Sequence, residues 1–316
     1  MLRSAVRRTL AAIGTAAMLL AGLASPSLGE AHARLATNSV ALHVQIASAA
    51  NTTFAYAELG SGPPLLLLNG TGSPMSEWDP ALLAQLMKSH RVIVFDYPGL
   101  GLSGPAPSIW RFSDAADWVA EFARVVSPDS PVNLMGWSMG GFIAQQLAIR
   151  HPEQVRKLVL AGTNAGGPTA TLGPKWVQAI DSESQAGDRA YLSTNYPHSR
   201  VAQSAGHSFL ERLARAVDSG AYPIERVPRA TYEAMVAAED PWLRSNANLR
   251  ALKALRVATL VITGILDVVT PAENSRLIAR QLPTARLVLV PDAGHSFLFQ
   301  NPVSTARTVN EFLSAA

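Results

Sequence analysis

A serine between glycines is the first group in this sequence that could do covalent chemistry. The pentapeptide Gly-Trp-Ser-Met-Gly at 136–140 follows the mostly apolar run 131–135 and precedes the helical pattern 141–150. Strand, Gly-x-Ser-x-Gly and helix in this order form a nucleophile elbow, a sharp turn that lifts the serine above the edge of a sheet. The glycines let strand and helix approach closely, because a Cβ would collide there. We therefore predict that Ser138 is a nucleophile.

A serine hydroxyl is a weak nucleophile at neutral pH and needs a neighbouring base. We predict His295 as this base, because it follows the apolar run 286–290 and so lies at the carboxyl end of a strand. Ligands of open parallel sheets bind at that edge. Asp267 follows the run 260–263 in the same way, and we predict that it accepts the Nδ1 proton of His295.

Two other aspartates compete with Asp267 for this role. Asp292 is only three residues before His295, poorly placed to reach the far ring nitrogen, and is expected to shape its loop. Asp96 is expected to hydrogen-bond its own loop. No pair of histidines has the spacing of metal ligands, so no metal site is predicted. The other histidines of the mature chain are interpreted as structural or surface residues: His43, His90, His151, His198 and His207.

Acyl transfer also needs donors for the developing oxyanion. The backbone N–H of Met139, directly after the nucleophile, is predicted as one donor. The second is predicted at Thr71, in the loop after the buried run 65–68. Gly70 and Gly72 on either side of Thr71 allow the backbone of this loop to come close to the substrate.

The elements that must position these residues alternate between strand and helix. Apolar runs at 65–68, 91–95, 131–135 and 157–161 are separated by helical patterns, which favours right-handed crossovers and a mainly parallel sheet. Residues 40–46 and 53–58 are predicted as a hairpin at one edge of this sheet.

Between the strands at 157–161 and 258–263 the rhythm changes. Residues 164–256 have helical patches broken by Gly and Pro, and we predict an inserted helical cap there. The core domain is then formed by residues 34–163 and 257–316. The fold class is α/β, a mostly parallel sheet flanked by helices.

The N-terminus has the layout of a secretory signal peptide. Three arginines among the first eight residues precede the apolar stretch 10–23, and small residues follow. We expect residues 1–33 to be removed, by cleavage after Ala33 or earlier near Ala24. The protein would then be exported, to the periplasm, the cell envelope or the medium, with no stable membrane span. An uncleaved anchor and a twin-arginine route are the alternatives.

Composition excludes several classes of function. Lys and Arg number 26 against 23 Asp and Glu, and no basic run outside the N-terminus suggests nucleic acid. The chain has no cysteine, so disulfides, a thiolate nucleophile and cysteine–zinc sites are excluded.

Taken together, these pieces resemble the α/β-hydrolase family, specifically serine hydrolases that carry a cap. Their order, with Ser138 before Asp267 and His295, is the order of that family. The family usually has His-Gly where this chain has Asn69-Gly70, and an asparagine can also form hydrogen bonds there. The matching segments are 65–70, 96–103, 136–141, 264–267 and 294–295.

The resemblance implies a serine hydrolase, and we expect it to cleave small carboxylic esters or related acyl substrates without a cofactor. A carbon–carbon bond hydrolase and a cofactor-free perhydrolase use the same triad. A proline-type aminopeptidase would need acidic groups in the cap, such as Glu233, Glu239 or Asp240. A binding protein without catalysis is a weaker alternative, because such proteins usually lose a triad member. Four apolar residues of the cap could line an acyl pocket or form the cap's own core: Trp176, Phe209, Met235 and Trp242.

Overall fold

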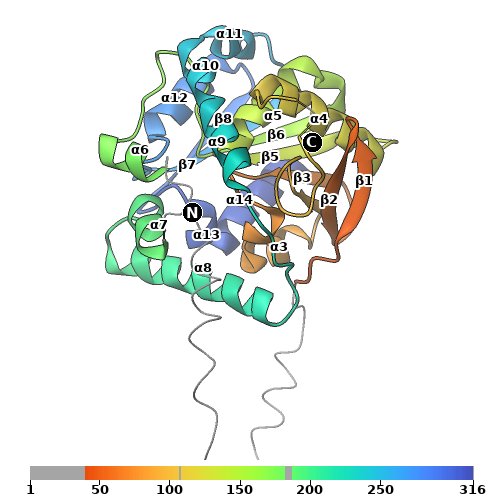
Figure 1. The fold of residues 1–316 in the computed structure, drawn as a ribbon. Coiled ribbons are helices and arrows are strands. Elements are labelled where there is room, and N and C mark those ends of the chain that lie inside the picture. Colours follow the sequence, from red (N-terminus) through yellow and green to blue (C-terminus); the bar gives the residue numbers. More distant parts are fainter. Residues whose placement is uncertain (1–39, 107, 182–186, 316) are drawn as a thin grey trace, which may run out of the picture.

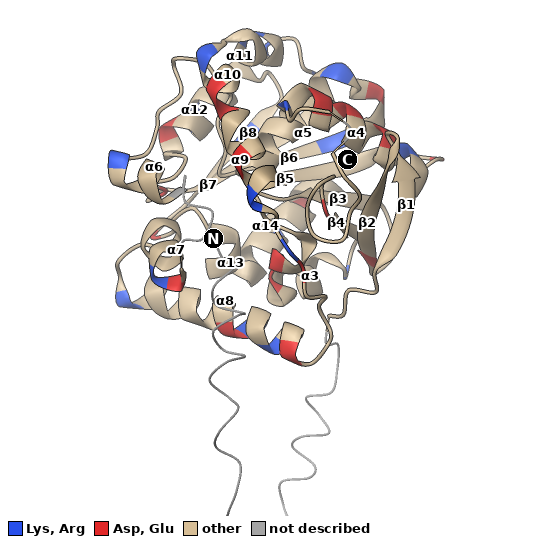
Figure 2. Ribbon diagram, in the orientation of Figure 1, with Lys and Arg blue, Asp and Glu red and all other residues tan. Residues whose placement is uncertain are grey.

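An eight-stranded sheet runs through the centre of the molecule in the computed structural model (Figure 1). The structure describes residues 40–106, 108–181 and 187–315, so the predicted signal peptide 1–33 lies outside the described residues. Among the described residues, no helix is long and apolar enough to cross a membrane. Basic and acidic residues are both scattered over the helices (Figure 2).

The strand order is β1-β2-β4-β3-β5-β6-β7-β8, and every pair from β4 to β8 is parallel. This confirms the predicted α/β class with a mostly parallel sheet. The strands are β1 (Gln45–Ala49), β2 (Thr52–Leu59), β3 (Pro64–Leu68), β4 (Arg91–Phe95), β5 (Val132–Trp137), β6 (Val155–Ala161), β7 (Ala258–Gly264) and β8 (Ala285–Val290).

The predicted edge hairpin is present, since β1 pairs antiparallel with β2 and β2 with β4. Its first strand begins later than predicted, at Gln45 instead of Val40. The N–H of Leu42 donates to the carbonyl of Ala221 (2.8 Å), so this stretch pairs with a distant segment and not with β2.

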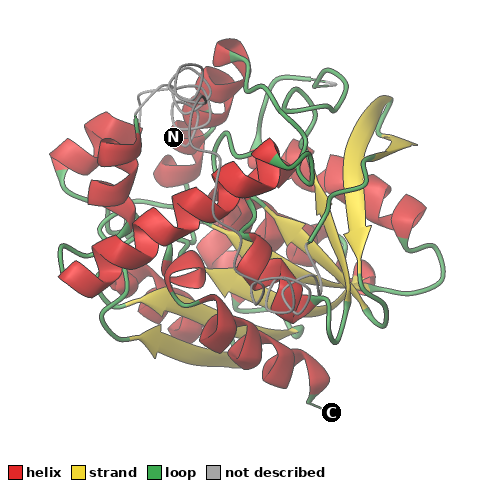
Figure 3. Ribbon diagram, turned by 90° about the horizontal axis from the view of Figure 1, so that it is seen from below, coloured by secondary structure: helices red, strands yellow, loops and turns green. Residues whose placement is uncertain are grey.

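Helices cover both faces of the sheet (Figure 3). On one face, Leu66 and Leu68 belong to a core with α4 (Phe112–Val126), α5 (Met139–Arg150) and α12 (Ala272–Gln281). On the other face, Leu65 and Leu67 pack in a core with residues of α3 (Pro80–Leu86), α13 (Phe297–Gln300) and α14 (Pro302–Ser314). Successive strand residues point to opposite faces, so all four leucines are fully buried. Each contributes about 2 kcal/mol of hydrophobic stabilisation.

The described residues between β6 and β7 form helices and no strand. We refer to residues 164–256 as the cap segment. Its helix α8 contacts α3 and α13, whereas α11 contacts α5 and α12, so the cap segment touches the core on both sides. Its helices are α6 (Lys175–Asp181), α7 (Asp188–Asn195), α8 (Arg200–Asp218), α9 (Arg229–Ala237), α10 (Glu239–Arg244) and α11 (Ala247–Leu252).

Candidate active site

Ser138 occupies the turn between β5 and α5. Its backbone has φ 57° and ψ −123°, a conformation that residues other than glycine rarely adopt. The glycines around it permit this turn. A Cβ on Gly136 would lie 2.3 Å from the carbonyl oxygen of Gly140, and one on Gly140 would lie 2.1 Å from that of Leu68. Strained backbone of this kind persists only where the surrounding structure holds it. The sequence thus places the hydroxyl of Ser138 at the sheet edge.

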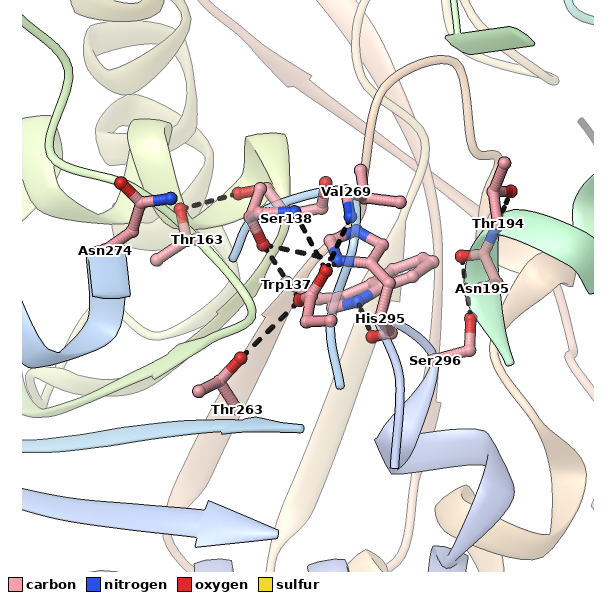
Figure 4. A network of polar contacts seen from close by, with 12 residues as sticks. Trp137, Ser138, Thr163, Thr194, Asn195, Thr263, Val269, Asn274, His295 and Ser296 are labelled. Carbon is pink, nitrogen blue, oxygen red and sulfur yellow. Dashed lines mark hydrogen bonds and ion pairs between the residues drawn. The ribbon is translucent and has the colours of Figure 1, made fainter. Parts of the chain in front are cut away.

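His295 and Asp267 meet at the carboxyl ends of β8 and β7, as Figure 4 shows for the histidine loop. His295 Nδ1 lies 2.9 Å from Asp267 Oδ2, and both residues are buried. Oδ1 of Asp267 accepts the N–H groups of Val269 (2.9 Å) and Thr270 (2.8 Å). These two backbone donors fix the position of the carboxylate group. The structure therefore gives the imidazole a carboxyl partner at Nδ1.

Thr270 is a residue that sequence reasoning missed. Its hydroxyl donates to Asp267 Oδ2 (3.0 Å) and lies 3.3 Å from His295 Nδ1. Part of the signal was available, because an aspartate commonly accepts the backbone N–H two residues later in an Asx turn, which brings the following residues close to its carboxylate. Trp137 was also missed: its indole N–H donates to the carbonyl of His295 (3.2 Å), and its ring packs against the imidazole.

The two rival aspartates lie elsewhere. Asp292 is exposed, has φ 50°, and its carbonyl accepts from the Gln300 amide, so it shapes the loop before His295. The buried Asp96 accepts the N–H groups of Leu102 and Met75 (both 2.8 Å). The bond to Leu102 confirms the prediction that Asp96 hydrogen-bonds its own loop.

Asp96 also shares a hydrogen bond with Glu225 of the cap segment. Glu225 Oε2 accepts the N–H of Ser76 (2.9 Å), and its Oε1 is inaccessible to solvent and receives no donor. Burial raises the pKa of both carboxyls, and the neighbouring Asp96 adds to the effect on Glu225, whose pKa rises to about 10. Asp96 has two backbone donors, so Glu225 carries the proton at neutral pH and donates it to Asp96.

The loop after β3 lies against the elbow. A Cβ on Gly70 would come within 3.4 Å of Ser138 Cβ, and Gly70 and Thr71 line the same cavity as Ser138. Met139 is the first residue of α5, so its N–H has no acceptor within the helix. The two backbone segments predicted to stabilise an oxyanion thus flank the serine.

Asn69, at the position where the resemblance implied a histidine, holds this loop. Its side-chain Nδ2 donates to the carbonyls of Ser73 (3.0 Å) and Pro74 (2.6 Å). Its backbone carbonyl accepts from the Tyr97 hydroxyl (3.3 Å). This confirms that an asparagine can form hydrogen bonds at this position. The consequence is a fixed path for the backbone of Thr71.

Ser138 and His295 open into a cavity of about 280 Å³ that the cap segment roofs. Of the four apolar cap residues considered above, only Trp242 is among the described lining residues. Phe209 and Met235 are fully buried in the two cores, and Trp176 is exposed.

Of the three acidic cap residues considered above, one lines the cavity and two are exposed. Glu239 lines the cavity, and its Oε1 accepts from the Thr71 hydroxyl (3.3 Å). Glu233 and Asp240 are exposed and form ion pairs with arginines of their own helices. In the part of the chain that the structure describes, no three His, Asp or Glu side chains gather as metal ligands would.

Comparison with known proteins places this architecture among described families. Residues 63–302 match the model of the alpha/beta hydrolase fold family. A poly(3-hydroxyalkanoate) depolymerase from Ectopseudomonas oleovorans is 30% identical over 252 residues, covering 79% of this chain and 84% of the relative. A pimeloyl-[acyl-carrier protein] methyl ester esterase from Aeromonas hydrophila is 27% identical over 256 residues, covering 80% and 96%.

A solved structure supports the same assignment of fold. The alpha/beta hydrolase fold protein from Chitinophaga pinensis superimposes with a TM-score of 0.75 at 23% identity, covering 88% of this chain and 99% of that one. Sheet order, elbow and sequence similarity agree, and this chain belongs to the alpha/beta hydrolase fold family.

Proposed function

We propose that this protein is an exported serine hydrolase that cleaves carboxylic esters through an acyl-enzyme intermediate. The observation that carries the proposal is the 2.9 Å contact between His295 Nδ1 and Asp267 Oδ2, in the cavity that also contains Ser138. A buried imidazole oriented by a carboxylate is the base that a serine nucleophile requires.

In the proposed mechanism each group of the triad has a defined step. Ser138 Oγ attacks the ester carbonyl while His295 Nε2 removes the hydroxyl proton. Asp267 stabilises the imidazolium that forms, and His295 then gives the proton to the leaving alcohol. Water enters, is deprotonated by His295 and attacks the acyl-enzyme. The bond between the acyl carbon and Ser138 Oγ then breaks, His295 returns the proton to Ser138 Oγ, and the acid is released.

The oxyanion of both tetrahedral intermediates is assigned to the backbone N–H groups of Met139 and Thr71. A preorganised donor of this kind contributes about 3 kcal/mol to transition-state stabilisation. The turn at Ser138 and the bonds of Asn69 hold both donors in place before substrate arrives.

The cavity favours a small acyl group. Phe142 and Trp242 stack with ring centroids 5.2 Å apart, and Val236 and Leu243 continue this apolar wall. Cavities for drug-sized ligands measure about 300–1,000 Å³, and this one is at the lower limit. We therefore assign the acyl chain to the apolar wall and expect short chains to be preferred.

The first experiment is hydrolysis of nitrophenyl esters of increasing chain length by the mature protein. We expect turnover to be highest for short chains and to be lost in Ser138→Ala. Ser304→Ala, at an exposed serine on α14, is the matched control and should behave like the wild type. Ester turnover that survives Ser138→Ala would contradict the assignment of the nucleophile.

A proline-type aminopeptidase is the second candidate, and the position of Glu239 favours it. This carboxylate lines the cavity and could bind a free amino group of a peptide. A proline arylamide distinguishes the two functions: cleavage of the arylamide with negligible ester turnover would replace the esterase proposal.

Export is proposed from the N-terminal sequence. Expression of the full chain in a bacterial host should yield a product in the periplasm or medium that lacks residues 1–33 or a shorter leader ending near Ala24. N-terminal sequencing of that product tests this, and an intact N-terminus in the membrane fraction would indicate an uncleaved anchor.

A further inference from the structure

Helix α7 of the cap segment forms hydrogen bonds with the loop that carries His295. The N–H of Ser296 donates to the carbonyl of Asn195 (3.1 Å), and the hydroxyl of Ser296 donates to Asn195 Oδ1 (3.0 Å), as Figure 4 shows. Tyr191 OH lies 2.8 Å from Ser296 Oγ. Since the hydroxyl proton of Ser296 goes to Asn195, the Tyr191 hydroxyl donates to Ser296.

The orientation of the Asn195 amide follows from its other contacts. Its Nδ2 donates to the carbonyl of Tyr191 (3.1 Å) and to Thr194 Oγ1 (2.9 Å), so Oδ1 faces Ser296. Tyr191, Asn195 and Ser296 are all at least 97% buried. A satisfied polar network in a low-dielectric interior is rigid, because any displacement leaves a buried group without its partner.

The backbone of the His295 loop lies close to α7 at Gly294. A Cβ at this position would lie 2.5 Å from the carbonyl oxygen of Asn195. The φ of Gly294 is not positive, so its own turn does not require glycine. The glycine before the histidine is therefore needed for the approach of the cap helix.

Tyr191 and Asn195 of α7 also face the cavity of the candidate active site. Tyr191 and Asn195 line the cavity with Ser138 and His295. On its other side the loop is held by Trp137, whose indole donates to the carbonyl of His295.

From these contacts we infer that α7 is a positioning element for His295, acting through Tyr191, Asn195 and Ser296. The cap segment thus has a part in activating the nucleophile as well as in enclosing the substrate. Displacement of α7 moves the imidazole and lowers the reactivity of Ser138. The inference rests on the proposed hydrolase chemistry of the triad.

The test measures how fast a fluorophosphonate probe reacts with Ser138, because this reaction needs an activated serine and no particular ester. Tyr191→Phe removes only the hydroxyl, Ser296→Ala removes the central link, and Gly294→Ala forces α7 away from the loop. We expect each to slow phosphonylation of Ser138 about tenfold, as small displacements of reacting groups do.

Tyr222→Phe is the matched control. Its buried hydroxyl also joins the cap segment to the core, by donating to the carbonyl of Trp78 (3.1 Å), but it does not touch the histidine loop. We expect Tyr222→Phe to lose similar thermal stability and to keep the wild-type rate. The double variant Tyr191→Phe/Ser296→Ala should be no slower than Ser296→Ala, because Ser296→Ala already breaks the bond between Tyr191 and Ser296.

Ester kinetics add a readout that a purely structural role would not change. We expect kcat to fall with little change in KM, and to fall further for alkyl esters than for nitrophenyl esters, because an alkoxide must be protonated by His295 in order to leave. Equal rates in Tyr191→Phe, Ser296→Ala and Tyr222→Phe would overturn the inference. A wild-type protein that the probe labels at Ser138 but that cleaves no ester would overturn only the ester proposal. Absence of labelling would overturn both.

Discussion

Replacing Glu225 by glutamine should change the pH dependence of folding stability. Relative to the wild type, the free energy of unfolding of the variant should increase as the pH rises. Glu225 joins the cap segment to the core by donating its proton to Asp96 and accepting the N–H of Ser76. Glutamine is isosteric and can make both bonds, with Nε2 donating to Asp96 and Oε1 accepting from Ser76. The variant differs from the wild type in having no proton to lose.

The magnitude follows from the pKa difference between the folded and unfolded chain. The pKa of Glu225 is raised from 4.5 to about 10, chiefly by burial. A raised folded-state pKa contributes stability that is complete below the unfolded value and is lost as the pH rises toward the folded value. The loss is at most about 1.4 kcal/mol per pH unit, so about 3 kcal/mol disappears between pH 5 and pH 7.

The assay is urea unfolding of wild type and Glu225→Gln at pH 5, 7 and 9. The free energy of unfolding of the variant, relative to wild type, should rise by up to about 3 kcal/mol over each two-unit step. Glu233→Gln, at an exposed glutamate of the cap segment, should show no such trend. Glu225→Ala should be destabilised at pH 5, because it leaves the N–H of Ser76 without its acceptor.

A flat difference between wild type and Glu225→Gln from pH 5 to pH 9 would refute the reasoning. It would mean that Glu225 is ionised in the folded protein and that Asp96 holds no proton from it. Equal destabilisation of Glu225→Gln and Glu225→Ala would show that the amide cannot replace the acid.

Three further changes test the site. Thr270→Val removes the hydroxyl bond to Asp267 and should lower kcat about tenfold with KM unchanged in steady-state ester assays. Gly140→Ala places a Cβ 2.1 Å from the carbonyl oxygen of Leu68 and should cost at least about 2 kcal/mol of stability in urea unfolding. Trp242→Ala opens the apolar wall and should move the optimum of the nitrophenyl ester series toward longer chains.

Each of these has a contrary result. Wild-type kcat in Thr270→Val would show that the backbone donors alone orient the carboxylate. A Gly140→Ala variant as stable as the wild type would mean that strand and helix can separate without cost. An unchanged chain-length optimum in Trp242→Ala would place the acyl chain away from this wall.

The sheet and the nucleophile elbow could be predicted from the sequence because both depend on short-range patterns of residues. The four leucines 65–68 had to be buried on both faces, and the glycines at 136 and 140 had to flank a tight turn. Hydrophobic periodicity and turn residues are determined by neighbouring positions, so they can be recognised in the sequence alone. The start of β1 was misread because Leu42 pairs with Ala221, far away in the sequence.

By itself, the sequence determined the class of fold, the strand edge where chemistry is placed, and the order of Ser138, Asp267 and His295. The tertiary structure shows Asp267 against the imidazole, as predicted, and not its rivals Asp96 and Asp292. It also decided that Glu225 pairs with Asp96 and that α7 holds the loop of His295. These last two contacts join residues more than 100 positions apart. No local pattern encodes them, because they form only when the cap segment packs on the core.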